Sequence, residues 1–511
     1  MTPSPDFDSF RQAYEGGADQ LVWTRLVDDL ETPVSAYLKL AGDEPYAFLF
    51  ESVEGGAWRG RYSVVAMRPD LIWRCRGDQA EISTGADLAA GRFEPQPGGA
   101  LDSLRDLAAR SRMPLPPGLP PMAGGLFGAL SYDMVRLVER LPDVNPDALG
   151  LPDGLMMRPR LVAIFDSIGQ EIILTTTARP DGRTARQAYD EAQAVLAEAA
   201  SALRRPLPVP PAQREPAAPT AFASPVSREA YWDVVERAKR YIEAGDIFQV
   251  VPSHRFRAPF ALPPFALYRS LRRLNPSPFL FYLNFGGFQL VGSSPEILVR
   301  LRDGKITIRP IAGTRPRGAT PEEDVALERD LLADPKERAE HLMLLDLGRN
   351  DVGRVAMLRQ EGANAPTKAK TGPSVRVTES FTIERYSHVM HIVSNVEGDA
   401  PDNVDPVDVL MAALPAGTLS GAPKVRAMEI IDELETEKRG LGYAGAVGYI
   451  GCDGSVDTCI VLRTALVKDQ TIYVQAGGGV VADSDPDAEY EETLHKSRAL
   501  RWAADEAWRF S

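Results

Sequence analysis

Hydrophobic residues recur at helical spacing in several stretches of the chain. A helix is predicted after Ser227, whose side chain can cap it, because apolar residues follow at positions that share one helical face: Tyr231, Val234, Val235, Ala238, Tyr241 and Ile242. Residues 185–203 predict an alanine-rich helix. A last helix is predicted with Asp485 as N-cap and Pro486 as its first residue.

Short runs of apolar and β-branched residues predict strands on both sides of residue 205. They lie at residues 47–50, 62–66, 161–165, 171–175 and 248–251. Near the end, residues 446–450, 457–466 and 472–475 predict an antiparallel meander, with Asp453-Gly454 as the hairpin turn. Strands and helices do not alternate around a phosphate-binding glycine loop, and AGTLSGAPK has the wrong spacing for one. The pattern therefore favours an α+β fold over a doubly wound sheet.

One change of composition divides the chain. Residues 206–225 are too rich in proline to form a helix or a central strand, and they predict a linker. With 511 residues, the chain also exceeds the size at which one hydrophobic core keeps growing. We therefore expect an N-terminal lobe at residues 1–205 and a second domain at residues 226–511.

Composition and charge limit the classes of function. The chain is 44% hydrophobic and 25% charged, as in ordinary globular proteins, and its net charge of −14 argues against sequence-independent nucleic-acid binding. The N-terminus has acids where a secretory signal would have a basic region, and no long apolar run follows, so we expect a cytoplasmic protein without a membrane partner. Cys75, Cys452 and Cys459 lack metal-ligand spacing and are expected to be buried.

Two helices carry acids in an arrangement that suits a metal ion. Glu489 and Glu492 are three residues apart on the last helix and therefore share a face. Acids near a helix N-terminus are more often only solvated. However, Glu340 lies beside the apolar run of residues 342–347, where an unpaired carboxylate is costly to bury. A cation shared by the three carboxylates would remove that cost, and an all-carboxylate set favours Mg²⁺ over zinc.

Two glycine-containing turns can present backbone N–H groups to an anion. Residues 417–424, GTLSGAPK, form a turn that leads into a helix and could hold a carboxylate. Gly477, Gly478 and Gly479 follow a predicted strand and would allow a ligand to approach the backbone closely. Each turn is weak evidence by itself, because tight turns need glycine in any case.

Ordered motifs along the chain indicate a family. The chain resembles the chorismate-utilising enzymes from about residue 33 to its end. This resemblance implies a two-lobed fold with antiparallel sheets flanked by helices, similar to that of aminodeoxychorismate synthase. The motifs are LFES (49–52), GDIFQVVPS (245–253), NPSPFLF (275–281), GSSPE (292–296), RPIAGTRPRG (309–318), AEHLMLLDLGRND (339–351), RYSHVMH (385–391), GTLSGAPKVRAM (417–428), DTCIVLRTALV (457–467) and QAGGGVV (475–481).

The resemblance implies roles for individual residues. Glu340 and Glu492 match the ligands of Mg²⁺, with Glu489 nearby. The matching chorismate contacts are Gly313, Thr314, Thr418, Tyr443, Arg463 on the predicted strand VLRTA, Gly477, Gly478 and Gly479. Glu296 is the candidate acid for the hydroxyl that leaves C4 of the ring. His391 is the candidate helper for loss of the C2 proton and pyruvate, although it could equally be a packed structural residue.

The nucleophile is expected to be ammonia. Relatives that add water carry a lysine where this chain has Gln249, which offers no base, and aminodeoxychorismate synthases carry a nucleophilic lysine in place of Ala312. The resemblance therefore implies amination of chorismate to anthranilate with release of pyruvate. No cysteine lies in a glutaminase-like motif, so a separate glutamine amidotransferase subunit is the expected partner. An aminodeoxychorismate synthase and a non-catalytic tryptophan-binding subunit remain the alternatives.

A second site is implied by the motifs LFES and NPSPFLF. They resemble the tryptophan feedback site of the family, with Glu51, Ser52, Pro278, Phe279 and Leu280 at the matching positions. The usual aromatic-methionine pair is Phe279-Leu280 here, so tryptophan inhibition is expected but its strength is left open. The segment between Arg354 and Glu379 is longer than usual for the family and is expected to be a surface loop.

Overall fold

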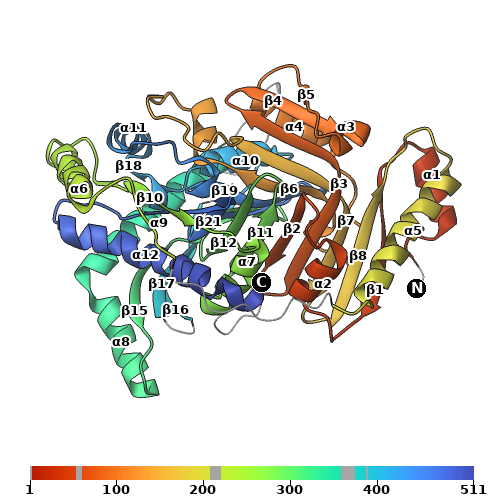
Figure 1. The fold of residues 1–511 in the computed structure, drawn as a ribbon. Coiled ribbons are helices and arrows are strands. Elements are labelled where there is room, and N and C mark those ends of the chain that lie inside the picture. The colour runs from red at the N-terminus through yellow and green to blue at the C-terminus, as the bar shows by residue number, and fades with distance from the viewer. Residues whose placement is uncertain (1–2, 53–59, 208–219, 358–374, 387–388) are drawn as a thin grey trace.

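The computed structural model describes residues 3–52, 60–207, 220–357, 375–386 and 389–511, which form a large curved sheet covered by helices (Figure 1). The helices are α1 (Phe7–Glu15), α2 (Pro33–Leu40), α3 (Gly85–Ala89), α4 (Ala100–Arg110), α5 (Ala185–Leu203), α6 (Arg228–Glu243), α7 (Pro264–Leu274), α8 (Pro321–Ala333), α9 (Pro335–Ala356), α10 (Pro406–Ala413), α11 (Lys424–Leu434) and α12 (Pro486–Glu506). Short 3₁₀ helices include η2 (Tyr132–Leu137), η3 (Gly417–Leu419) and η4 (Gly440–Gly442).

Antiparallel strands run through the whole length of the described chain. They are β1 (Gln20–Val27), β2 (Ala47–Glu51), β3 (Tyr62–Arg76), β4 (Gln79–Thr84), β5 (Glu94–Pro95), β6 (Gly125–Leu130), β7 (Gly154–Asp166), β8 (Glu171–Ala178), β9 (Gln249–Val250), β10 (Ser253–Pro259), β11 (Phe279–Asn284), β12 (Gln289–Ser294), β13 (Ile297–Arg302), β14 (Lys305–Ile308), β15 (Ile311–Pro316), β16 (Arg376–Arg385), β17 (Val389–Asp399), β18 (Gly421–Ala422), β19 (Ala446–Gly451), β20 (Val456–Ile460), β21 (Thr464–Lys468) and β22 (Thr471–Gly477). With the helices packed on them, they confirm the predicted α+β class.

The predicted helix ends are confirmed by capping hydrogen bonds. The side chain of Ser227 accepts a hydrogen bond from the backbone of α6, and that of Asp485 accepts one from α12. Thr184 caps α5, which spans the predicted residues. Each cap satisfies backbone N–H groups that have no partner within the helix. These helix ends could be predicted because their determinants are local.

One ladder of antiparallel strands connects the two halves of the chain. Its neighbours follow in the order β10, β22, β21, β12, β11, β2, β3, β7, β6, β19, β20, β13, β14 and β17. Strand β2, from the N-terminal segment, pairs with β11 on one side, and β6 pairs with β19. The segments on either side of the proline-rich region therefore share one sheet.

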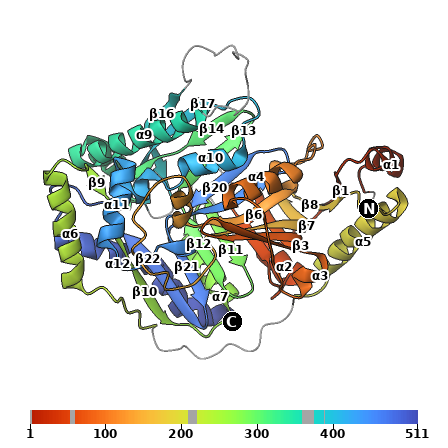
Figure 2. The ribbon, with the colours of Figure 1, turned by 90° about the horizontal axis from the view of Figure 1, so that it is seen from above.

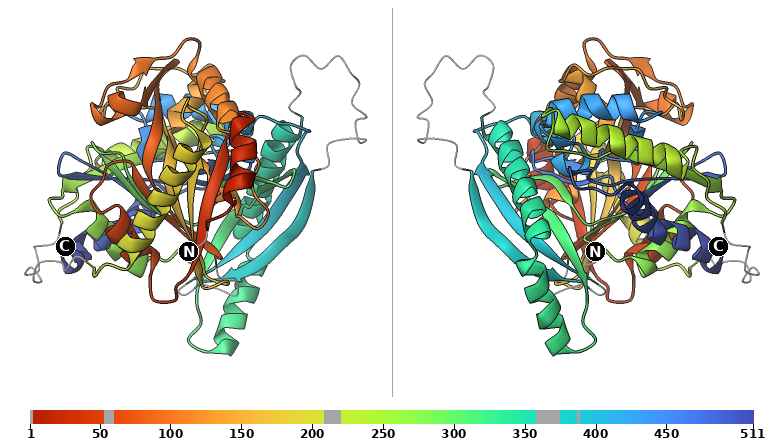
Figure 3. Two further views of the ribbon diagram at one scale, coloured as in Figure 1. Left: turned by 90° about the vertical axis from the view of Figure 1, so that its right-hand side faces the viewer. Right: turned by 90° about the vertical axis from the view of Figure 1, so that its left-hand side faces the viewer.

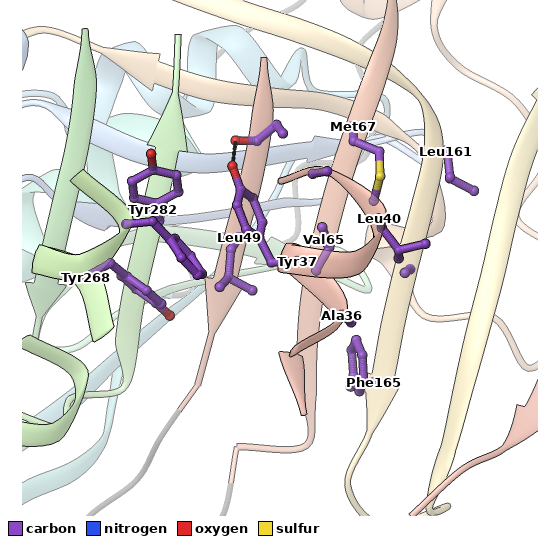
Figure 4. Close-up of a cluster of buried hydrophobic side chains, with 14 of the residues drawn as sticks. Ala36, Tyr37, Leu40, Leu49, Val65, Met67, Leu161, Phe165, Tyr268 and Tyr282 are labelled. Carbon is purple, nitrogen blue, oxygen red and sulfur yellow. Dashed lines mark hydrogen bonds between the residues drawn. The ribbon is translucent and has the colours of Figure 1, made fainter. Parts of the chain in front are cut away.

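The segments before and after the proline-rich region also share a hydrophobic core. In the cluster of Figure 4, Tyr37 on α2 stacks on Phe265 of α7 with ring centroids 4.6 Å apart and meets the edge of Tyr282 on β11. Leu49 and Val65 belong to the same cluster and are fully buried. The division into residues 1–205 and 226–511 stays a prediction, and most of the predicted linker lies outside the described residues.

Two of the predicted strands are wrong in their extent. Residues 457–466 do not form one strand, because β20 ends at Ile460 and β21 begins at Thr464. The two pieces join different neighbours, β19 and β13 for β20, but β12 and β22 for β21. Strand β9 is also short, and Phe248 before it is 74% exposed. The hairpin at Asp453-Gly454 is confirmed between β19 and β20.

The helices that matter for the site gather at one end of the molecule. Helices α6, α11 and α12 lie at the end opposite α1 and α5 (Figures 1 and 2). Helix α8 projects from the body beside β15 to β17 (Figure 3). The predicted long surface loop falls mostly on residues 358–374, outside the described part. Among the described residues, no helix is both long enough and apolar enough to cross a membrane.

Candidate active site

The predicted metal ligands come from α9 and the first turns of α12. Glu340 is half-buried on α9, and Glu489 is buried on α12. Burial raises the pKa of Glu340, and the nearby negative charges of Glu337 and Glu492 raise it further. Residues on two helices that are far apart in the sequence thus act electrostatically on the same carboxyl group.

Glu489 has an oxygen without a hydrogen-bond partner in the described structure. Its Oε1 accepts a hydrogen bond of 2.7 Å from Ser484 Oγ, but its Oε2 is buried and unpartnered. Burial raises the pKa of Glu489, the Ser484 hydrogen bond lowers it, and the charge of Glu492 raises it again. An unpartnered buried carboxylate oxygen is costly. A cation at this point would satisfy it.

The described residues do not form a ready-made metal cage. Among them, no group of three or more His, Cys, Asp or Glu side chains is close enough together to hold an ion. The candidate carboxylates come from two separate helices, α9 and α12, and the Glu492 side chain is 46% exposed.

Two charged residues near these carboxylates were not predicted from the sequence. Lys496 forms an ion pair of 2.7 Å with Glu492 and donates a hydrogen bond of 3.0 Å to the carbonyl of Gly477. Glu337 pairs with Arg315 at 3.0 Å. Glu492 and Lys496 are four residues apart, and this spacing on a helix could have predicted their ion pair. Nothing in the sequence indicated that Lys496 reaches Gly477.

Of the three glycines at the end of β22, Gly478 lies against the acids of α12 and Gly479 lies against Gln249. A Cβ atom added to Gly478 would lie 2.7 Å from Glu489 Oε2, and one added to Gly479 would lie 2.3 Å from Gln249 Nε2. A side chain at either position would therefore have to displace the end of the Glu489 or Gln249 side chain. Gln249 itself is 4% exposed, and its Oε1 has no hydrogen-bond partner among the described residues.

Glu296 lies in the loop between β12 and β13, at the centre of the predicted residues. Thr418, on η3, donates a hydrogen bond of 3.1 Å to Glu296 Oε2. Burial raises the pKa of Glu296, while the positive charge of Arg463 and the Thr418 hydrogen bond lower it. The pKa remains above the ordinary glutamic acid value. This carboxyl is therefore protonated at higher pH than an exposed one and is suited to donate a proton.

Arg463 does not lie on a strand, contrary to the prediction. It sits between β20 and β21 with φ of 47°, in the left-handed region that is unfavourable for residues other than glycine. At this turn the chain passes from β20, which pairs with β19 and β13, to β21, which pairs with β12 and β22. Burial lowers the pKa of Arg463, and the charge of Glu296 opposes that change. A strained backbone conformation at a half-buried arginine is of the kind that clusters at functional sites.

His391 and Thr314 are opposite each other on β17 and β15. A bulge at Gly313, whose φ is 66°, interrupts the register just before this pair. His391 Nδ1 lies 3.0 Å from the Gly313 carbonyl oxygen and 3.1 Å from Thr314 Oγ1. A carbonyl oxygen only accepts hydrogen bonds, so Nδ1 carries the proton and Nε2 is left as the acceptor. Burial lowers the pKa of His391, which keeps the ring neutral and able to accept a proton.

Tyr443 is buried directly after η4. Its ring centroid lies 5.3 Å from the guanidinium carbon of Arg439. The charges of Glu296 and Lys496 both act on the Tyr443 hydroxyl. Thr418 contacts Glu296, and Lys496 contacts Gly477, so several of the predicted residues are related by hydrogen bonds or charge. Their roles in binding and catalysis stay predictions.

The predicted tryptophan-site residues form a separate group around β2 and β11. Glu51 is the register partner of Leu280, and Ser52 and Phe279 follow at the same end of the two strands. Glu51 is 4% exposed and accepts hydrogen bonds from Tyr268 and, at 2.7 Å, from Arg272 Nε. Tyr268 and Arg272, on α7, were not predicted, because no local pattern links a helix to the end of a distant strand.

Comparison with known proteins identifies the family. A family profile described as "chorismate binding enzyme" matches residues 61–501. The chain belongs to the chorismate-binding enzymes. This chorismate-binding enzyme is 57% identical to anthranilate synthase component 1 of Cereibacter sphaeroides over 99% of this chain and 98% of that protein. It is 50% identical to the protein of the same name from Pseudomonas aeruginosa, over 92% of each chain.

Solved structures agree with this assignment. The anthranilate synthase component I from Streptococcus pneumoniae superposes with a TM-score of 0.74 at 35% identity, over 93% of this chain and 98% of that one. The menaquinone-specific isochorismate synthase from Escherichia coli gives a TM-score of 0.69 at 19% identity, over 97% and 100%. The second likeness shows that the fold is shared. Together they confirm the predicted fold family.

Proposed function

We propose that this enzyme converts chorismate and ammonia to anthranilate, pyruvate and water. The observation that carries the proposal is Glu296, whose pKa is raised by burial and whose carboxylate accepts a hydrogen bond from Thr418 and is acted on by the positive charge of the half-buried Arg463. Gln249, which is buried, offers no base that could activate water. The relatives named anthranilate synthase component 1 support the same reaction.

The acids fit a magnesium ion bound together with the substrate. Glu340, Glu489 and Glu492 would hold it, and the unpartnered Oε2 of Glu489 is the clearest sign that a cation belongs here. When bound, Mg²⁺ supplies positive charge to the ring carboxylate of chorismate. All three ligands are carboxylates, which suits Mg²⁺.

In the first step, ammonia bonds to C2 of the ring, the double bonds shift, and the C4 hydroxyl leaves as water. Hydroxide is a poor leaving group, so Glu296 donates the proton that the hydroxyl needs. Arg463 can bind a carboxylate of chorismate through paired hydrogen bonds. Gln249 cannot deprotonate water, and this disfavours water as the competing nucleophile.

In the second step, the C2 proton is removed, and the bond between the enolpyruvyl oxygen and the ring breaks as the ring becomes aromatic. The leaving group departs as the enolate of pyruvate and takes up one proton at its methylene carbon to give pyruvate. Nε2 of the neutral His391 is the acceptor for the C2 proton. The hydroxyl of Thr314 and the carbonyl oxygen of Gly313 lie within hydrogen-bond distance of Nδ1, the other ring nitrogen, and orient the His391 ring. This step is the one that separates anthranilate formation from simple amination of chorismate.

A partner subunit would supply the ammonia from glutamine. The three cysteines of this chain are all buried, and burial raises the pKa of each thiol, which makes them poor nucleophiles for a glutaminase reaction. Free ammonium should support turnover without that partner.

The reaction is tested by mixing the purified chain with chorismate, Mg²⁺ and ammonium and following anthranilate fluorescence. Pyruvate should appear in equal amount. The formation of aminodeoxychorismate without pyruvate would instead support the sister activity, which the alanine at position 312 disfavours. Binding of tryptophan without any turnover of chorismate would support a purely regulatory protein.

We also propose that tryptophan inhibits the enzyme at the site around Glu51. Ser52→Phe is expected to relieve this inhibition at least tenfold, because the larger side chain fills space at the end of β2 beside Phe279. Turnover without tryptophan should stay near that of the wild type. The measurement is the tryptophan concentration that halves activity. Ser167→Phe, at an exposed serine in the turn after β7, is the control, and equal inhibition of all three proteins would place the effector elsewhere.

A further inference from the structure

Arg439 is a fully buried arginine between α11 and η4. Its side chain is 1% exposed. Nη1 donates a hydrogen bond of 2.7 Å to the carbonyl of Leu419, and Nη2 donates one of 2.7 Å to the carbonyl of Val251. Nε donates to the carboxylate of Glu435 at 3.1 Å. One guanidinium therefore joins two backbone segments that are far apart in the sequence.

The segments that Arg439 joins are those that carry candidate active-site residues. Leu419 directly follows Thr418, the donor to Glu296, and Val251 is two residues beyond Gln249. The guanidinium also lies over two aromatic rings, 4.7 Å from the centroid of Tyr132 and 5.3 Å from that of Tyr443.

Glu435 extends this hydrogen-bond network through Ser253 to β22. Its Oε1 accepts hydrogen bonds of 2.8 Å from both the backbone N and the Oγ of Ser253. Gln475, on the strand that leads to Gly477, donates to Ser253 Oγ at 2.8 Å. The pair of Glu435 and Arg439 thus connects the Gln249 strand, the Thr418 turn, Tyr443 and the strand before the three glycines.

A buried ion pair often contributes no more to the stability of a protein than apolar residues of similar volume would. Only a planar guanidinium can direct two donors at two carbonyls while its face packs on aromatic rings. Displacing catalytic groups by about 1 Å can cost about 10²-fold in rate. The geometry of Arg439 suits the task of fixing these groups relative to one another.

We propose that Arg439 is a positioning residue for the reaction, holding Gln249, Thr418 and Tyr443 in one fixed arrangement without touching the substrate. This inference rests on the proposed function. It predicts a loss in the chemical step, because Thr418 hydrogen-bonds the candidate acid Glu296. The loss in chorismate binding should be smaller, because only Thr418 and Tyr443 among the candidate chorismate contacts are held by Arg439, and Arg463 and the three glycines accept or donate none of its hydrogen bonds.

The test is Arg439→Lys, which keeps the positive charge but cannot reach both carbonyls with a planar fork. Measured on folded protein well below its melting temperature, kcat should fall about 10²-fold, with a much smaller rise in KM for chorismate. Arg158→Lys is the matched control. Arg158 also forms a partly buried pair, with Asp70 at 2.7 Å, but it lies on β7 and joins no candidate catalytic segment.

Three results would overturn the proposal: a folded Arg439→Lys variant with kcat near that of the wild type, an equal loss in Arg158→Lys, or a loss seen only in KM. If Arg439→Lys does not fold, Glu435→Gln decides instead. That variant keeps the shape of the pair but loses the charge that orients the guanidinium, and normal kcat in it would overturn the proposal. Wild-type turnover is measured first. Its absence would defeat the proposed function itself, whereas equal activity of wild type and variants would defeat only the role of Arg439.

Discussion

Glu340→Gln is expected to reduce turnover of chorismate by about 10³-fold or more. The charge that a metal ion supplies is worth several kcal/mol in the transition state, and each 1.4 kcal/mol corresponds to a factor of ten. A glutamine at position 340 keeps the size of the side chain but removes the negative charge that interacts with Glu492. The rate is measured as anthranilate formed at saturating ammonium and Mg²⁺.

Calorimetry gives a second measurement on the same variant. Wild-type protein should bind chorismate more tightly when Mg²⁺ is present, and Glu340→Gln should lose most of that difference. Asp346→Asn is the control, because Asp346 lies on the same helix with a side chain that is 61% exposed and paired with Arg349. Near-normal rates and normal Mg²⁺-dependent binding in Glu340→Gln would remove Glu340 from the metal site.

Glu296→Gln is expected to lower kcat by about 10²- to 10⁴-fold, the range over which a general acid contributes. Glutamine can still accept the hydrogen bond from Thr418 but has no proton to give to the leaving hydroxyl. The KM for chorismate should change little. A rate near that of the wild type would show that another group, or water, protonates the hydroxyl.

The pH dependence provides an independent check on Glu296. An acid must be protonated to act, and burial raises the pKa of Glu296, so the wild-type rate should stay high to a higher pH than an ordinary glutamic acid would allow. It should then fall as the pH rises through that raised pKa. Glu296→Gln should lack this fall, whereas the control Glu397→Gln, on β17, should retain it. The same alkaline fall in Glu296→Gln would assign it to a different group.

Many residues of the candidate site could be predicted because many family motifs follow one another along the chain. The geometry of the site could not be predicted from them. Residues such as Lys496 and Glu337 escaped prediction, since each acts through a partner that lies elsewhere in the chain, Gly477 in one case and Arg315 in the other. Arg463 was placed on a strand because VLRTA has strand-forming residues. The change of neighbours from β13 to β12 instead forces a turn there.

The sequence by itself determined the features that depend on residues close along the chain. These include the extent of α5, the N-caps of α6 and α12, the hairpin at Asp453-Gly454 and the identity of the acids. The tertiary structure alone decided which distant segments meet: Thr418 with Glu296, Glu337 with Arg315, and Arg439 with both Leu419 and Val251. Helix caps and turns are set by local backbone hydrogen bonds. Contacts between distant residues depend on strand order and register, which are fixed only when the whole sheet pairs and buries its shared core.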